Sequence, residues 1–179
     1  MEYNVSHLLK SPVGTTREYN IEPADLALDD ETTAHIRDGH ARFDRTNTGV
    51  LARGSVGATV TVSCARCLDP VDEPVDVGFT EEFEPTIDVS TGRPLPASEN
   101  ELAFPIDQHH ILDLGEAIRQ NMLAALPIAP LCRDDCAGLC PVCGVNRNTD
   151  PCACVADEAN RPFAELPELL LPELLRESS

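Results

Sequence analysis

Alternating polar and apolar positions are clearest between residues 48 and 84. The apolar positions of the first half recur every second residue, with one gap at position 54, at Val50, Ala52, Val56, Ala58, Val60 and Val62. Those of the second half do the same at Val75, Val77, Phe79 and Phe83. A period of two with β-branched residues predicts two strands. Because the segment SCARCLD lies between them, we expect Cys64 and Cys67 at the tip of an antiparallel hairpin or strand connection.

Helical spacing replaces this alternation between residues 113 and 126. Ile118, Met122, Ala125 and Leu126 share one helix face. Asp113 is the expected N-cap, with Glu116 three residues later as in a capping box. Pro127 and Pro130 follow, and proline ends a helix. This segment is the main helix that the sequence predicts.

The remaining segments have weaker patterns. EYNVSHLL (2–9) predicts a first strand, and GTTREYNIEP (14–23) a turn into a second. Residues 23–43 carry acids early and bases late, an order that suits a helix or helical turn. Four prolines between residues 85 and 108 indicate a surface loop. The tail contains LPELL twice, which suits a capping helix or an acidic docking segment.

These patterns predict an α+β fold, in which an antiparallel sheet or open barrel is combined with one main helix and a zinc-bound C-terminal lobe. We expect a core domain over 1–130, a cysteine-rich lobe packed on it over 131–156, and a Leu-rich acidic tail over 157–179.

Charge narrows the choice of partner. The chain has 31 acidic and 13 basic side chains and a formal net charge of −18. Nucleic acid should repel such a body, since affinity for phosphate comes from Lys and Arg. A basic protein is the better partner, although the acidity also fits a merely soluble surface or a halophilic host. No apolar run is long enough to span a membrane, and residues 1–14 lack the order of a secretory signal. We therefore expect a cytoplasmic protein.

The eight cysteines form four short chelating pairs. The pairs are Cys64/Cys67, Cys132/Cys136, Cys140/Cys143 and Cys152/Cys154. In a reducing compartment disulfides are a poorer explanation than zinc, for which thiolate is a common ligand. Eight ligands make two closed four-cysteine sites, and closed four-coordinate sites are structural. One zinc with free thiols, disulfides and an iron–sulfur cluster remain alternatives.

Two partitions of the pairs are open. We favour Cys64/Cys67 with Cys132/Cys136, which leaves Cys140/Cys143 and Cys152/Cys154 to close a loop through the turn-rich linker GVNRNTDP. The rival joins Cys64/Cys67 to Cys140/Cys143, as in a zinc ribbon built from two knuckles.

Catalytic signals are weak. A thioredoxin-like role for CARC would need a helix after the first cysteine, whereas prolines and strand-like alternation follow. The five histidines show no ligand spacing, and no P-loop, GxGxxG or GxSxG motif is present. We therefore expect that this protein is not an enzyme.

The segments VTVSCARCLDPV, FTEEF, DLGEAIRQNMLAALPIAPLC, CAGLCPVCGVNRN with CAC, and RPFAEL occur in an order that resembles the YceD family, the large ribosomal RNA subunit accumulation proteins of bacteria and plastids. The resemblance covers roughly residues 48 to 170. It implies a non-catalytic factor in ribosome biogenesis, with the cysteines of CARC and of the C-terminal cluster as metal ligands. The expected partner is a basic ribosomal protein or a large-subunit assembly intermediate.

Two other functions compete with this interpretation. Arg66, Arg133 and Arg147 lie in or beside the cysteine turns and could bind RNA, although salt bridges to Asp69, Asp134 or Asp135 are the simpler role for them. A thiol- or zinc-responsive regulator is the third hypothesis.

Overall fold

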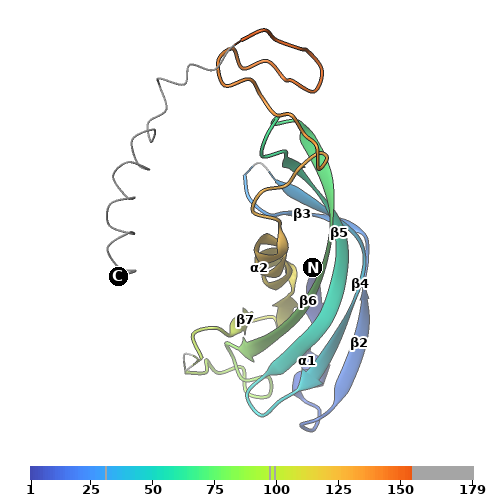
Figure 1. Cartoon of the computed structure of the whole chain (residues 1–179). Helices are drawn as coiled ribbons and strands as arrows, with labels where there is room; N and C mark the ends of the chain where they lie inside the picture. The colour runs from blue at the N-terminus through green and yellow to red at the C-terminus, as the bar shows by residue number, and fades with distance from the viewer. Residues whose placement is uncertain (31, 97, 99, 155–179) are drawn as a thin grey trace, which may run out of the picture. The chain divides into compact units, whose positions relative to one another are not determined.

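A long antiparallel hairpin forms the centre of the structure, a computed structural model (Figure 1). Strands β5 (Val50–Ser63) and β6 (Pro70–Pro85) pair in unbroken register from Val50 opposite Phe83 to Ser63 opposite Pro70. Both strands follow the polar and apolar alternation of the sequence, and their apolar residues are buried on one face of the sheet. The hairpin predicted from the sequence is confirmed.

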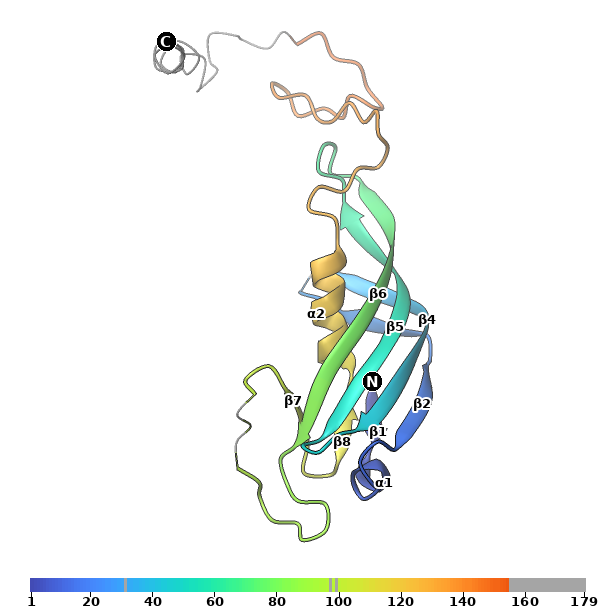
Figure 2. The ribbon, with the colours of Figure 1, turned by 60° about the horizontal axis from the view of Figure 1, so that its bottom comes forward.

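Four more strands extend this hairpin into a six-stranded sheet (Figure 2). Strand β4 (Thr33–Arg45) pairs with β5 on one side, and with β2 (Thr16–Ile21) and β3 (Ala24–Ala27) on the other. Strand β7 (Phe104–Ile106) adds to the end of β6 in parallel. A separate two-stranded sheet joins β1 (Glu2–Asn4) to β8 (Ile111–Asp113). Because β7 runs parallel to β6 while the other pairs are antiparallel, the six-stranded sheet is mixed, and the fold is α+β.

The main helix, α2 (Gly115–Ala125), lies against the concave face of the sheet and contacts β6 and β3 (Figure 1). Ala117, Ile118 and Met122 are fully buried there. The helix was predicted correctly, but its cap was not. Leu114 is the N-cap and makes no side-chain cap bond. Asp113 belongs to β8, where its Oδ1 accepts from the N-terminal ammonium group at 2.9 Å and from the Gly115 N–H at 2.8 Å.

The helical prediction for residues 23–43 is wrong, because this segment forms β3 and most of β4. Ala34 and Ile36 are buried at even positions, whereas Ala41 and Phe43 are buried at odd ones. A register shift between Ile36 and Asp38 changes the parity. Such a bulge breaks the period of two by which a strand is predicted from sequence.

The strand prediction for residues 2–9 and the loop prediction for residues 85–108 hold in part. Residues 2–9 form β1 followed by the short helix α1 (Ser6–Leu9) rather than a single strand. Residues 85–108 are mostly loop, with an isolated bridge between Ile87 and Pro94 and with β7 near the end.

The structure describes residues 1–154 except 31, 97 and 99. The chain separates into two compact units, unit 1 of residues 1–64 and 69–132 and unit 2 of residues 65–68 and 133 onwards. The predicted tail, 157–179, lies outside the described residues. Every member of the hydrophobic core cluster belongs to unit 1. Within the part of unit 2 that is described, the buried apolar residues are Cys67, Cys136 and Cys140. Unit 2 thus lacks an aliphatic core of its own there.

Candidate metal centres

The two Cys-x-x-Cys turns share two features of backbone geometry. The N–H of Cys64 donates to the carbonyl of Asp69 at 2.8 Å, and that of Cys140 donates to the carbonyl of Val145 at 2.8 Å. In each turn the residue after the second cysteine has a positive φ, 64° at Leu68 and 73° at Gly144. The sequence therefore builds two equivalent turns, each presenting a pair of sulfurs.

The eight sulfurs gather into two groups of four. The first tetrad is Cys64, Cys67, Cys132 and Cys136, and the second tetrad is Cys140, Cys143, Cys152 and Cys154. Within each tetrad all four Sγ atoms lie within 4.8 Å of one another. This grouping is the one that the cysteine spacing favoured, and the rival zinc-ribbon grouping is not the one observed.

Each tetrad fits a tetrahedral metal ion. A zinc–sulfur bond of about 2.3 Å places the sulfurs of a tetrahedral site about 3.8 Å apart, which lies inside the observed limit. Thiolates are soft donors that favour zinc or iron–sulfur clusters over magnesium or calcium. Four sulfurs would occupy every position of a four-coordinate ion, which leaves none for a substrate or an activated water.

The sulfurs of the second tetrad also influence one another's ionisation. The backbone N–H groups of Cys143 and Val142 donate to the Cys140 sulfur and lower its pKa to about 6. Hydrogen bonding to Cys143 and burial raise the pKa of Cys154 to about 12. Hydrogen bonding to Cys140 raises the pKa of Cys152. Four thiolates so close together repel one another, and a divalent cation is the group that relieves this repulsion.

The first tetrad is the more enclosed of the two. Cys64, Cys67 and Cys136 are buried and Cys132 is exposed. In the second tetrad Cys140 alone is buried. A chelator should therefore reach the second tetrad more readily than the first.

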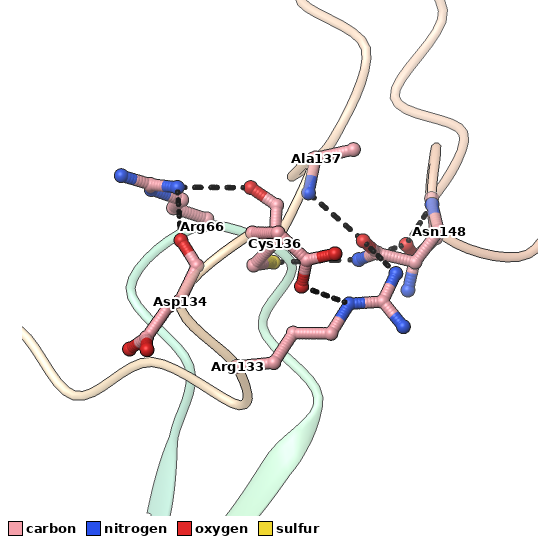
Figure 3. A network of polar contacts seen from close by, with 8 residues as sticks. Arg66, Arg133, Asp134, Cys136, Ala137 and Asn148 are labelled. Atoms are coloured by element: carbon pink, nitrogen blue, oxygen red, sulfur yellow. Dashed lines mark hydrogen bonds and ion pairs between the residues drawn. The ribbon is translucent and has the colours of Figure 1, made fainter.

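A polar network surrounds Cys136 within unit 2 (Figure 3). The Arg66 guanidinium donates to the Cys136 carbonyl at 3.0 Å, and the Arg66 carbonyl accepts from the Leu139 N–H at 2.9 Å. The amide group of Asn148 lies on the other side of Cys136 and donates to its sulfur at 3.4 Å. The two contacts of Arg66 hold the turn that carries Cys136, and the amide group of Asn148 donates directly to the sulfur.

The three arginines proposed for RNA binding lie in different surroundings. Arg66 is engaged with the Cys136 carbonyl and, at 3.5 Å, with the Asp134 carbonyl. Arg133 pairs with Asp135 at 3.3 Å and donates to Asn148 at 2.6 Å. Arg147 is exposed, and its backbone N–H donates to the Gly138 carbonyl. Two of the three guanidinium groups therefore stabilise unit 2, one of them through a salt bridge of the kind expected.

Sequence reasoning missed Asn148. It lies in the linker GVNRNTDP, which was assigned only the role of closing a loop. A single asparagine in a turn-rich linker carries no periodic signal, and its target sulfur lies in a different cysteine pair.

Comparison with known proteins identifies relatives. The family model for the large ribosomal RNA subunit accumulation protein YceD matches residues 52–170. An uncharacterized protein of Mycobacterium tuberculosis is 36% identical over 135 residues, which cover 74% of this chain and 61% of that protein. An uncharacterized protein of Mycobacterium leprae is 29% identical over 133 residues, which cover 74% of this chain and 58% of that protein.

A plant protein is also similar. The large ribosomal RNA subunit accumulation protein YCED homolog 1 of Arabidopsis thaliana, a chloroplastic protein, is 28% identical over 140 residues. The match covers 65% of this chain and 43% of that protein. The chain thus spans less than two thirds of the length of these relatives. No solved structure matches. Among the described helices, none is both long and apolar enough to cross a membrane.

Proposed function

Since the chain belongs to the YceD family of large ribosomal RNA subunit accumulation proteins, we propose that it is a non-catalytic cytoplasmic factor in ribosome biogenesis that supports accumulation of large-subunit ribosomal RNA. The family match over residues 52–170 carries this proposal. The printed name of the plant relative, which contains the same description, supports it.

The factor acts through contact with a basic ribosomal or assembly protein. The net charge of −18 supports this mechanism, because it attracts basic surfaces and repels bare RNA. Strand β6 concentrates the charge: its sequence PVDEPVDVGFTEEFEP has six acids and no base. Asp72, Asp76 and Glu82 on this strand are exposed.

Zinc has a structural role in this proposal. Each tetrad holds one ion through four thiolates, and metal binding takes the place of an aliphatic core for the described part of unit 2. The convergence of the sulfurs supports this assignment, as does the composition of the two groups, in which every ligand atom is a cysteine sulfur.

Depletion of the protein in its host tests the biological role. We expect the ratio of large-subunit to small-subunit ribosomal RNA to fall, and we expect a plasmid copy to restore it. An unchanged ratio in a strain that lacks the protein would overturn the proposal.

Affinity purification of the metal-loaded full chain tests the mechanism. Large-subunit ribosomal proteins should be recovered equally before and after RNase treatment, and mass spectrometry identifies them. Loss of all binding after RNase would instead favour RNA binding through the cysteine turns, and Arg147 would then be the first residue to substitute.

A further inference from the structure

The amide group of Asn148 uses all of its hydrogen-bonding capacity inside unit 2 (Figure 3). Its Oδ1 accepts from the Ala137 N–H at 2.8 Å and from Arg133 at 2.6 Å. Its Nδ2 donates to the Cys136 sulfur at 3.4 Å and to Asn146 Oδ1 at 2.9 Å. A side-chain amide has two donors and two acceptor sites. The orientation of Asn148 is therefore fixed by four partners.

The position of Asn148 in the chain connects the two tetrads. Asn148 lies between Cys143 and Cys152, in the loop that the second tetrad closes. Cys136, whose sulfur it contacts, belongs to the first tetrad. The conformation of the loop that the second tetrad closes thus determines whether Asn148 can donate to the sulfur of Cys136 in the first tetrad.

Hydrogen bonds and closure by the second tetrad both hold the conformation of this loop. Its backbone is ordered by short bonds, from the Asp150 N–H to the Asn146 carbonyl at 2.9 Å and from the Arg147 N–H to the Gly138 carbonyl at 2.9 Å. None of the residues described in unit 2 belongs to the hydrophobic core cluster. Closure at the second tetrad therefore acts together with these hydrogen bonds to position Asn148.

A hydrogen bond from a fixed donor orients a ligand sulfur, and the loss of such an outer bond lowers metal affinity by about 10- to 100-fold. A donor held in place by one bound ion therefore strengthens the binding of the next. Coupling of this kind is reciprocal, so each ion raises the affinity for the other by the same factor.

We propose that Asn148 is a positioning residue for the first tetrad, and that through it metal binding at the second tetrad raises the metal affinity of the first. This inference rests on the proposed structural metal ions. It predicts that each tetrad loses its ion sooner when the other is empty.

Cadmium NMR of the reduced full-length chain tests the proposal, because each four-cysteine site gives its own signal and each can be titrated against a chelator. The Asn148→Ala substitution should weaken cadmium binding at the first tetrad by about 10- to 100-fold and shift its signal, since a hydrogen bond to sulfur is lost. Asn148→Asp keeps the size and the acceptor oxygens but loses the donor, so it should weaken the same site.

Thr149→Ala is the matched control. Thr149 lies in the same loop, and its hydroxyl contacts the Asn146 carbonyl and Asp150 without reaching a cysteine. This substitution should leave both cadmium signals and both affinities within about twofold of the original values, because a surface change of this kind has little energetic effect.

Removal of the second tetrad measures the coupling directly. Cys152→Ser with Cys154→Ser should weaken the first tetrad about 10- to 100-fold in the original chain and by less than about threefold in the Asn148→Ala chain. Equal losses in both chains, or full affinity in Asn148→Ala and Asn148→Asp, would overturn the inference while leaving metal binding intact. A chain that binds no ion at either tetrad would instead refute the metal assignment itself.

Discussion

At the scale of single residues, the two cysteine turns differ at the position after the second cysteine. Leu68 and Gly144 both have a positive φ, which costs an L-residue about 1–2 kcal/mol and costs glycine almost nothing. Leu68 is 63% exposed, so it gains little from burial in return. A β-carbon added at Gly144 would meet nothing within 4 Å, so any penalty there comes from the backbone alone.

This comparison predicts that substitutions at Gly144 and at Leu68 differ in their effect on metal affinity. Gly144→Ala should lower metal affinity by about 5- to 30-fold, the equivalent of 1–2 kcal/mol. Leu68→Gly should change it by less than about threefold, because relief of backbone strain offsets the greater freedom of the unfolded chain. Competition with a chelator measures both. Equal losses in the two variants would show that the conformation of these turns does not limit binding.

Asp44 is an acidic residue of β4 whose side chain is held by three donors. Its carboxylate accepts from Thr16 at 2.7 Å, from Arg42 at 2.9 Å and from Arg53 at 2.6 Å. These donors, Thr16 first, lower its pKa to about 2, from an ordinary value of 3.8. Arg42 and Arg53 lie directly opposite each other on β4 and β5, where like charges repel. The carboxylate of Asp44 compensates for this repulsion.

Because the pKa of Asp44 is lowered in the folded state, its contribution to the free energy of unfolding depends on pH. Its stabilising effect is complete above the unfolded pKa near 4 and is lost as the pH falls towards 2. We expect the free energy of unfolding of unit 1 to decrease over that interval, and to decrease less in Asp44→Asn. Urea titrations followed by tyrosine fluorescence measure this, since Tyr3 and Tyr19 both pack near Phe43 in unit 1. Identical pH profiles would exclude this role.

At the scale of elements, sequence patterns predicted those features that depend on residues close together in the chain. The β5–β6 hairpin follows from alternation, α2 from helical spacing, and the four cysteine pairs from short spacings, whereas the partition of the pairs into tetrads was left between two arrangements. Strand β4 was missed because its bulge shifts the alternation, and β7 and β8 because three residues carry no period. The bond from Asn148 to Cys136 joins a linker residue to a cysteine outside the two pairs that the linker connects, so the spacing within a pair cannot reveal it.

Strand β6 is the element on which the proposed partner contact can be tested. Asp72→Asn with Asp76→Asn and Glu82→Gln removes three exposed charges without changing side-chain size appreciably. We expect recovery of large-subunit ribosomal proteins in affinity purification to fall at least several-fold, because long-range attraction to a basic surface depends on these charges. The effect should shrink as salt is added.

The matched control removes three exposed acids elsewhere. Glu2→Gln with Glu18→Gln and Glu22→Gln changes the net charge equally on and beside β1 and β2. If both triple variants lose the same amount of bound protein, net charge alone is responsible and β6 has no special part.

At the scale of the whole molecule, the two units depend on different forces. The core of unit 1 is apolar and includes Phe43, Phe83, Ile118 and Met122. The buried apolar residues of unit 2, over its described part, are cysteines. Because the energy of metal binding is folding energy where no other core exists, chelation should affect the two units unequally.

We predict that a strong chelator unfolds unit 2 and leaves unit 1 folded. The chain has two tyrosines and no tryptophan, and Tyr3 and Tyr19 lie in unit 1, so tyrosine fluorescence reports unit 1 alone. Amide exchange of residues 133–154 should accelerate by several orders of magnitude when metal is removed, whereas the fluorescence and the exchange of β4 and β5 remain unchanged. Re-addition of zinc should restore protection. Collapse of both units together on chelation would mean that the apolar sheet core is insufficient without the metal ions.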